Sequence, residues 1–388
     1  MDKNSIIYVA GGTGLVGSAL IRKLKEKGYK NIVSTFYKKK PLDKTVNWYK
    51  VDLTNQIEVE NFFTKIKPNY VFLAAAKVGG IWANNLYRAD FIFSNLQIQN
   101  NVIYYSYKYK VKKLLFLGST CIYPKMSPQP IKEDYLLTGP LEYTNEPYAI
   151  AKIAGLKMCE SFNLQYGTNF ITVMPTNLYG YNDNFDLETS HVLPALIRKM
   201  HLGKLLMNNN WEGIKKDLDK NPIEGIDGNS SQKEIMEILK KYGILRRNGN
   251  VIVEIWGTGK PKREFLWVDD LADACVYLMN NVNFLDIVKI KYPNLDFSNK
   301  TLQEVYPYYE IRNTHINIGT GEEISIRDLA LLIKEIINFN GELFFNTQKP
   351  DGTPRKVTDV SLLHSLGWRH KTSLKEGIKK LYEWYIKN

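Results

Sequence analysis

Cysteines are scarce in this sequence, and long apolar runs are missing from it. Three cysteines occur among 388 residues, at Cys121, Cys159 and Cys275, and none of them has CxxC spacing. Such a set predicts neither a disulfide framework nor a cysteine metal site, and it is typical of a reducing compartment. No run of about 18 apolar residues occurs, and no charged segment followed by an apolar one opens the chain. We therefore expect a cytoplasmic protein that does not span a membrane.

The chain also lacks long runs of Lys and Arg, although it is basic overall. It carries 52 Lys and Arg against 40 Asp and Glu, a formal net charge of +12. This surplus favours an acidic partner: a nucleic acid, a membrane surface or a phosphorylated small molecule. Because a nucleic-acid interface usually presents a continuous basic stripe, the scattered charge argues against nucleic acid. With 44% hydrophobic and 24% charged residues, the composition is that of a globular protein of about two or three structural units.

Strand and helix patterns alternate through the first half of the sequence. The strands expected there are 6–10, 31–37, 70–75, 113–117 and 170–174, and the helices include 56–66, 89–109 and 148–166. Such alternation predicts a parallel, doubly wound α/β sheet of about six strands in a domain spanning 1–180. The remainder, 181–388, loses this regular order and predicts a smaller mixed domain for the substrate, with some segments returning to the first domain. Two polar segments near 208–250 and 283–312 are interpreted as surface insertions.

A glycine motif joins the first expected strand to the first expected helix. It follows the apolar run 6–10 directly and consists of Gly11, Gly12, Thr13, Gly14, Leu15, Val16 and Gly17. This placement predicts a dinucleotide site, because backbone N–H groups of such a turn and the helix N-terminus can face a pyrophosphate. NAD sites usually carry an acidic residue at the end of the second strand, whereas Lys38, Lys39 and Lys40 stand there. These cations favour the 2′-phosphate of NADP, and Asp52 is placed to meet the adenine.

A candidate catalytic triad is centred on the expected helix 148–166. Tyr148 and Lys152 are four residues apart, so their side chains share one face of that helix. An adjacent ammonium favours the phenolate form of a tyrosine and is expected to lower its pKa toward the working range. Ser119, just after the strand 113–117, is placed to donate a hydrogen bond to a carbonyl oxygen. These three residue types predict a reductase that protonates a ketone oxygen.

With these residues in place, the sequence resembles the extended short-chain dehydrogenase/reductases, which have a Rossmann fold, and within them the GDP-L-fucose synthase family. The stretches that carry the resemblance follow in order through both expected domains: LAAAKVGGIWANN (73–85), KLLFLGSTCIYPK (113–125), NEPYAIAKIAG (145–155), VMPTNLYG (173–180), SHVLPALIRK (190–199), WGTGKPKREFLWVDDLA (256–272), HINIGTG (315–321) and KPDGTPRK (349–356). Such a series is more specific than any single motif. The two interpreted insertions fall between its members.

The resemblance implies an NADPH-dependent enzyme that converts GDP-4-keto-6-deoxy-D-mannose to GDP-L-fucose. A 4-ketone acidifies the hydrogens on C3 and C5, so an acid and a base on opposite faces of the ring can invert these two carbons. Cys121 and His191 match the pair that the family uses, and a thiol and an imidazole suit proton exchange near neutral pH. The C4 ketone is then reduced with the help of Ser119, Tyr148 and Lys152.

The resemblance also assigns binding residues and an assembly. For the GDP-sugar it nominates Lys199, Trp256, Arg263, Asp351 and Lys356. For the cofactor it adds Leu117, Gly118, Lys152, Pro175, Thr176, Asn177 and Leu178 to the glycine motif. The helices 89–109 and 148–166 resemble the pair through which this family forms homodimers. No metal is expected.

Two departures from the family pattern leave other functions open. Thr13 stands where a basic residue near the 2′-phosphate is common, and the segment 208–250 is inserted beside the sugar region. One alternative is therefore a C4 reductase of a related GDP-4-keto-6-deoxy sugar, such as a heptose, with little or no epimerase activity. Another is a non-catalytic NADP-binding sensor or a nucleic-acid binder, against which the intact triad argues.

Overall fold

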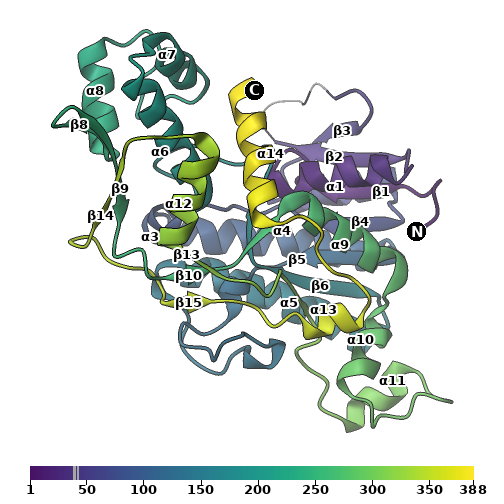
Figure 1. Ribbon diagram of the computed structural model, residues 1–388. Coiled ribbons are helices and arrows are strands. Elements are labelled where there is room, and N and C mark those ends of the chain that lie inside the picture. Colours follow the sequence, from purple (N-terminus) through teal and green to yellow (C-terminus); the bar gives the residue numbers. More distant parts are fainter. Residues whose placement is uncertain (38–40, 42) are drawn as a thin grey trace.

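The computed structural model describes residues 1–37, 41 and 43–388, and its centre is a parallel sheet of seven strands (Figure 1). Across the sheet the order is β12-β6-β5-β4-β1-β2-β3, and every neighbouring pair is parallel. The strands are β1 (Ile7–Ala10), β2 (Ile32–Phe36), β3 (Asn47–Lys50), β4 (Tyr70–Leu73), β5 (Lys113–Leu117), β6 (Phe170–Pro175) and β12 (Ile316–Ile318). The predicted doubly wound α/β fold is confirmed. Its strand order reverses between β1 and β4, where such sheets bind ligands.

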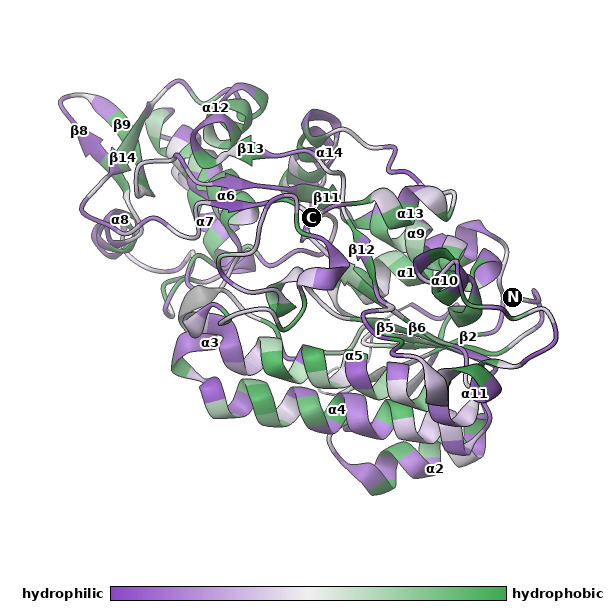
Figure 2. Ribbon diagram, turned by 90° about the horizontal axis from the view of Figure 1, so that it is seen from below, coloured by the Kyte–Doolittle hydropathy of each residue, from purple (hydrophilic) through white to green (hydrophobic). Residues whose placement is uncertain are grey.

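Helices cover both faces of this sheet. One face packs against α1 (Leu15–Glu26) and α9 (Val268–Asn281), and the other against α2 (Gln56–Ile66), α4 (Arg88–Lys108) and α5 (Glu146–Tyr166). Figure 2 shows α4 and α5 lying side by side along the second face. Because successive strand residues point to opposite faces, Val9 packs with α1 whereas Tyr8 packs with α2. Both faces are therefore apolar, which explains the continuous apolar run in the sequence.

The second half of the chain contributes to the central sheet as well. β12 pairs with β6 and forms the seventh strand, which the sequence did not predict because three residues carry too little pattern. A short parallel pair, β11 (Phe265–Trp267) with β7 (Asn177–Tyr179), links the two halves next to the end of β6.

The remaining elements form a mixed α and β region around its own apolar core. One small sheet has the order β13-β10-β15, and the other has the order β14-β9-β8. Their strands are β8 (Ile244–Arg247), β9 (Asn250–Trp256), β10 (Lys262–Arg263), β13 (Ile324–Ser325), β14 (Glu342–Asn346) and β15 (Arg355–Lys356). The accompanying helices are α6 (Val192–Met207), α12 (Ile326–Ile337) and α14 (Leu374–Lys387), and shorter helices elsewhere are α3 (Ile81–Leu86) and α13 (Ser361–Ser365).

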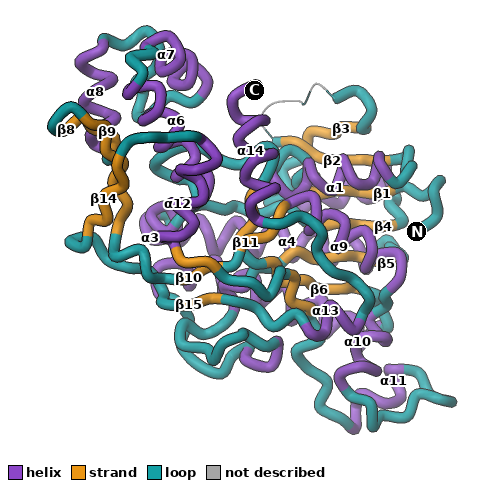
Figure 3. The backbone as a smooth tube through the Cα atoms, in the orientation of Figure 1, coloured by secondary structure: helices purple, strands orange, loops and turns teal. Residues whose placement is uncertain are grey.

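The two segments interpreted as insertions are folded and contain helices of their own. The first holds α7 (Trp211–Lys220) and α8 (Gln232–Lys241), and the second holds α10 (Phe284–Lys291) and α11 (Leu302–Val305). They lie at opposite ends of the molecule (Figure 3). Ser231 and Glu234 form a capping box at the start of α8, a local device that stabilises a helix in a polar segment. No helix among the described residues has the length and apolarity needed to cross a bilayer.

A buried ion pair joins the first of these segments to α6. The fully buried Arg198 donates from Nε to Asp217 Oδ1 at 3.0 Å and from a terminal nitrogen to the Phe185 carbonyl at 3.1 Å. Its other terminal nitrogen donates to the Asn221 carbonyl, and the Tyr385 hydroxyl donates to the second oxygen of Asp217. Arg198 therefore connects α7 with the loop that leads from Phe185 to the start of α6.

We predict that Asp217→Ala lowers the free energy of unfolding by about 3–5 kcal/mol, because the Arg198 guanidinium would stay buried without its carboxylate. Urea denaturation measures the loss. The matched control is Glu335→Ala, which removes an ion pair with Lys375 whose two side chains are each 65% exposed. That change should cost less than about 1 kcal/mol, and similar losses in the two variants would contradict this account of Asp217.

Candidate active site

The glycine turn between β1 and α1 is packed too tightly for side chains at several positions. A Cβ atom on Gly12 would lie 2.2 Å from Ser34 Oγ, and one on Gly17 would lie 2.0 Å from the Gly11 carbonyl oxygen. Gly11 itself has a φ of +84°, which favours glycine. Gly14 precedes α1, and no side chain caps this helix N-terminus. Its first N–H groups are thus available to an anion, and the turn fits the diphosphate of a dinucleotide.

Of the residues predicted at the adenosine end of the cofactor site, the structure describes Asp52. Asp52 follows β3, and its Oδ1 accepts hydrogen bonds from the backbone N–H and the hydroxyl of Thr54, at 2.9 and 2.7 Å. Lys38, Lys39 and Lys40 lie outside the described residues. The predicted contact with a 2′-phosphate therefore stays a prediction.

The other predicted cofactor residues meet the glycine turn at one edge of the sheet. Because β1, β5 and β6 are parallel, their carboxyl ends share that edge. The glycine turn follows β1, Gly118 and Ser119 follow β5, and the segment 175–178 runs from the end of β6 into β7. This edge is where doubly wound sheets bind their ligands.

The predicted triad is assembled at the same edge. Lys152 lies one turn after Tyr148 on α5, with Nζ 5.7 Å from the centroid of the Tyr148 ring. Lys152 Nζ also donates to the Leu117 carbonyl at 2.8 Å, which fixes α5 against the end of β5. Ser119 Oγ accepts from the backbone N–H of Cys121 at 3.3 Å. The spacing in the sequence thus places Tyr148 and Lys152 on one face of α5. The end of β5 brings Ser119 and Cys121 to the same edge of the sheet.

Burial governs the protonation of the triad. Desolvation raises the pKa of Tyr148, with a further contribution from Cys121, and desolvation lowers the pKa of Lys152 to about 8. The pKa of Tyr148 is therefore not lowered as expected from the adjacent ammonium, because desolvation is the largest influence on the buried phenol. A protonated phenol is the form that can donate a proton to a ketone oxygen.

Cys121 and His191 differ in their surroundings. Cys121 is buried in a 3-10 helix at Thr120–Ile122, where burial raises the pKa of its thiol although Lys356 acts in the opposite direction. His191 directly precedes α6, without a side-chain hydrogen bond to the helix, and it is open to solvent, yet desolvation by the surrounding protein lowers its pKa. At neutral pH the pair therefore consists of a protonated thiol and a neutral imidazole. The segment before His191 contacts the loop after β4, since Gly80 N–H donates to the Thr189 carbonyl at 3.0 Å.

The residues nominated for the GDP-sugar fall into two groups. Arg263 and Lys356 are partners in the parallel pair β10–β15, so two cations stand side by side. Arg263 is held by the Thr353 carbonyl at 2.6 Å. Desolvation lowers the pKa of both cations. A bound anion would favour their charged forms.

The second group consists of Trp256, whose ring is exposed, and two charged residues that bind next to its strand. Asp351 accepts from the Thr258 N–H at 2.9 Å and from its hydroxyl at 2.8 Å, which joins the segment 349–356 to the turn after Trp256. Lys199 donates to the Glu254 carbonyl at 2.9 Å, and burial lowers the pKa of its ammonium to about 8. Both charged residues thus support the strand that carries Trp256.

Glu264 is a residue that the sequence analysis missed. It is fully buried, and its carboxylate accepts from the N–H groups of Thr320 at 2.6 Å and Gly321 at 2.7 Å, and from the N–H and hydroxyl of Thr358 at 2.9 and 2.8 Å. Its own carbonyl accepts from Asn177 Nδ2 at 2.8 Å. Glu264 therefore joins Asn177, one of the predicted cofactor residues, to the strand that carries Arg263. The available signal was a charged residue directly before the apolar run 265–268, since a buried carboxylate requires donors.

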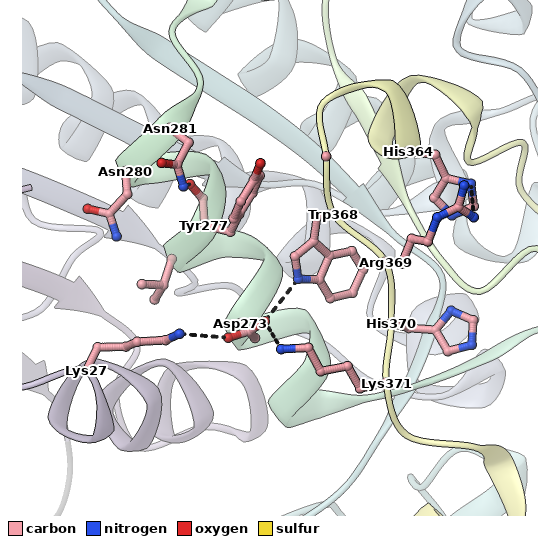
Figure 4. Close-up of a pocket in the computed structure, with 12 residues that line it drawn as sticks. Lys27, Asp273, Tyr277, Asn280, Asn281, His364, Trp368, Arg369, His370 and Lys371 are labelled. Carbon is pink, nitrogen blue, oxygen red and sulfur yellow. Dashed lines mark hydrogen bonds and ion pairs between the residues drawn. The ribbon is translucent and has the colours of Figure 1, made fainter.

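A hollow of about 580 Å³ lies away from this edge, between α1, α9 and residues 364–371 (Figure 4). None of the predicted site residues lines it. Its carboxylate, Asp273, has several partners there: it accepts from Trp368 Nε1 at 3.0 Å and lies 3.5 Å from Lys27 and 3.3 Å from Lys371. Lys27 is also the C-cap residue of α1, where a cation stabilises a helix end. We attribute a structural role to these residues.

Comparison with known families places the chain. The family described as the NAD dependent epimerase/dehydratase family matches residues 7–216 and 233–290. The chain belongs to this family. The stretch between the two matched parts, 217–232, lies within the first inserted segment. No cluster of His, Cys, Asp or Glu suited to a metal ion was found among the described residues.

Similar proteins include biosynthetic enzymes of GDP-sugars. The chain is 47% identical to GDP-L-fucose synthase 1 of Arabidopsis thaliana over 387 residues, covering 100% of this chain and 95% of the relative. Among solved structures, a GDP-6-OMe-4-keto-L-xylo-heptose reductase from C. jejuni is 47% identical, with a TM-score of 0.84, covering 99% of this chain and 98% of that one. A GDP-D-glycero-L-gluco-heptose synthase from Campylobacter jejuni, in the presence of NADPH, is 46% identical, with a TM-score of 0.83, covering 99% of each chain.

We predict that Glu264→Gln lowers the free energy of unfolding by about 2 kcal/mol or more, because an amide nitrogen would face N–H donors that need an acceptor. Chemical denaturation measures this loss. The matched control is Glu323→Gln, which weakens ion pairs to Lys262 and Arg355, two half-exposed side chains. That substitution should cost less than about 1 kcal/mol. Equal effects would show that Glu264 does not hold the two sides of the edge together.

Proposed function

We propose that the protein is an NADPH-dependent epimerase and reductase that converts GDP-4-keto-6-deoxy-D-mannose to GDP-L-fucose. The observation that carries this proposal is the grouping of Ser119, Tyr148, Lys152 and Cys121 at the end of β5, on the sheet edge that also holds the glycine turn. A ketone reductase needs the first three residues. The retained Cys121 supplies a group that can exchange protons on carbon, and similarity to the GDP-L-fucose synthase of Arabidopsis thaliana supports the substrate.

The reduction uses groups whose protonation the structure explains. The turn 11–17 and Lys152 hold the cofactor, and NADPH supplies a hydride for C4 when bound. Tyr148, kept protonated by burial, donates its proton to the C4 oxygen, while the Ser119 hydroxyl hydrogen-bonds that oxygen. The positive charge of Lys152 offsets the phenolate that remains.

The epimerisation uses Cys121 and His191 on the same keto sugar. The neutral imidazole of His191 can accept a proton from an acidified carbon, and the protonated thiol of Cys121 can return one from solvent. Arg263 and Lys356 bind the diphosphate as adjacent cations. The exposed ring of Trp256 offers a flat apolar surface to the guanine, and Lys199 and Asp351 support its strand.

A second candidate is a C4 reductase of a GDP-4-keto-6-deoxy-heptose with little epimerase activity. The similarity to the C. jejuni heptose reductase, at 47% identity and a TM-score of 0.84, favours it. Incubating the enzyme and NADPH with GDP-4-keto sugars of both classes, followed by mass spectrometry and NMR of the products, separates the two. Formation of GDP-L-fucose supports the first function, and reduction of the heptose alone supports the second.

We further propose that the enzyme is a cytoplasmic homodimer formed through α4 and α5. These neighbouring helices carry exposed apolar side chains, among them Phe93 at 63% and Ile150 at 42% exposure. Burying them against a second copy in a four-helix bundle would remove this apolar surface from water. Light scattering at micromolar concentration should give the mass of two chains, and a monomeric mass would contradict the proposal.

We predict that Tyr148→Phe slows reduction by about 10²–10⁴-fold, because it removes the proton donor to the ketone oxygen. The decrease in NADPH absorbance measures the rate, and fluorescence titration should show retained NADPH binding. The control is Tyr143→Phe, which changes an exposed tyrosine in the 3-10 helix before α5. A near-normal rate in the Tyr148 variant would refute the triad assignment.

We predict that Cys121→Ser separates the two half-reactions. A hydroxyl takes part in proton exchange far less readily than a thiol, so deuterium uptake from D2O at C3 and C5 should collapse while NADPH binding remains. The variant should also reduce an already epimerised 4-keto sugar much faster than the unepimerised one. NMR of the products measures both effects, and uptake at the wild-type rate would exclude Cys121 from the epimerisation.

A further inference from the structure

The side-chain oxygen of Asn145 has no hydrogen-bond partner in the part of the chain that the structure describes. Asn145 stands directly before α5, three residues ahead of Tyr148. An Asn at this position usually caps the helix by accepting a hydrogen bond from a first-turn N–H group. The Asn145 side chain makes no such bond, and its Oδ1 is buried without a hydrogen-bond partner among the described residues. Since buried polar atoms are nearly always paired, we expect a group from outside the protein to donate a hydrogen bond to this oxygen.

The same side chain lines a small hollow that also contains Cys121. Its volume of about 30 Å³ is sufficient for about two waters or one small polar group. Two other polar groups of the wall have partners within the protein: Lys125 Nζ lies 2.8 Å from Glu142 Oε2, and Gln129 Oε1 accepts from the Val357 N–H at 2.8 Å. Asn145 is thus a wall residue with free hydrogen-bonding capacity beside Cys121.

We propose that Asn145 is a substrate-binding residue whose amide accepts a hydrogen bond from a sugar hydroxyl next to the carbon that faces Cys121. The chemistry of Oδ1 selects the partner, because this oxygen accepts only and its partner must donate. A phosphate or the ketone oxygen offers no donor, whereas a sugar hydroxyl does. The donor is a hydroxyl either on the ring or on the exocyclic carbon chain. This inference rests on the proposed function, since it assigns a contact of the GDP-sugar in that site.

The test compares the binding of GDP-mannose and GDP by calorimetry, in the wild type and in Asn145→Leu. Leu has a similar size and cannot accept a hydrogen bond, so the variant should bind GDP-mannose about tenfold more weakly and bind GDP equally well. Its melting temperature should not fall, because the Asn145 side chain makes no hydrogen bond to any of the described residues. Unchanged GDP-mannose affinity, which is expected if Oδ1 only holds a water, overturns the proposal. Weakened GDP binding or a large fall in melting temperature also overturns it.

Asn55→Leu is the matched control. Asn55 does cap its helix, since Oδ1 accepts from the Ile57 N–H at 3.0 Å and the Glu58 N–H at 3.3 Å. Its substitution should lower the melting temperature and leave both affinities unchanged, the opposite of the pattern expected for Asn145→Leu. Equal patterns in the two variants would show that Asn145 is structural.

A third ligand, GDP-6-deoxy-mannose, identifies the hydroxyl. If Asn145→Leu weakens its binding as it does that of GDP-mannose, the ring carries the partner; if it weakens GDP-mannose alone, the C6 chain carries it. Both results support the proposal. Because these experiments measure binding without NADPH, they test the role of Asn145 even if the protein does not reduce GDP-4-keto sugars. Intact binding without turnover contradicts only the proposed reaction, whereas wild-type protein that binds GDP-mannose no better than GDP overturns the role of Asn145.

Discussion

The hydrogen bond from the buried ammonium of Lys152 to the Leu117 carbonyl, at 2.8 Å, is the contact on which the site depends. It joins α5 to the carboxyl end of β5, and so brings the helix that carries Tyr148 to the strand end that Ser119 and Cys121 follow. Removing the charged amine from water is unfavourable, which lowers its pKa to about 8. An anionic cofactor would offset that cost by favouring the charged form. The same contact therefore holds the triad together and prepares it for a dinucleotide.

The substrate side is held to this edge by two further buried charges. Glu264 receives four short hydrogen bonds from two loops beside Arg263 and Lys356. Arg198 ties the segment that leads to His191 to α7 of the inserted segment. In each case a charge is kept in the interior by donors or acceptors from segments distant in sequence. The cofactor and substrate halves are consequently positioned by polar contacts in the core as well as by apolar packing.

Much of this arrangement follows from local sequence signals. The glycine motif after 6–10 predicts its turn because only glycine fits beside Ser34 and the Gly11 carbonyl. The spacing of Tyr148 and Lys152 predicts a shared face because α5 is regular. β12 was missed because it is three residues long, and its place beside β6 depends on the rest of the sheet.

Properties that arise from burial were beyond the reach of the sequence. The raised pKa of Tyr148 comes from the atoms that enclose it, and those atoms come from several segments. Glu264 has no motif of its own, since its partners lie 56 to 94 residues away. The interpretation of 208–250 as a surface insertion does not specify its helix α7, because polar residues dominate there, whereas the capping box at Ser231 marks the start of α8.

The most direct test of a site that both epimerises and reduces is the fate of hydrogen in the wild-type reaction. The enzyme would be incubated in D2O with GDP-4-keto-6-deoxy-D-mannose and NADPH, and the product analysed by NMR and mass spectrometry. We expect GDP-L-fucose with solvent deuterium at C3 and C5 and with the hydrogen of NADPH at C4. A reduced product without deuterium at C3 and C5 would contradict the account, because Cys121 and His191 would then take no part in the reaction.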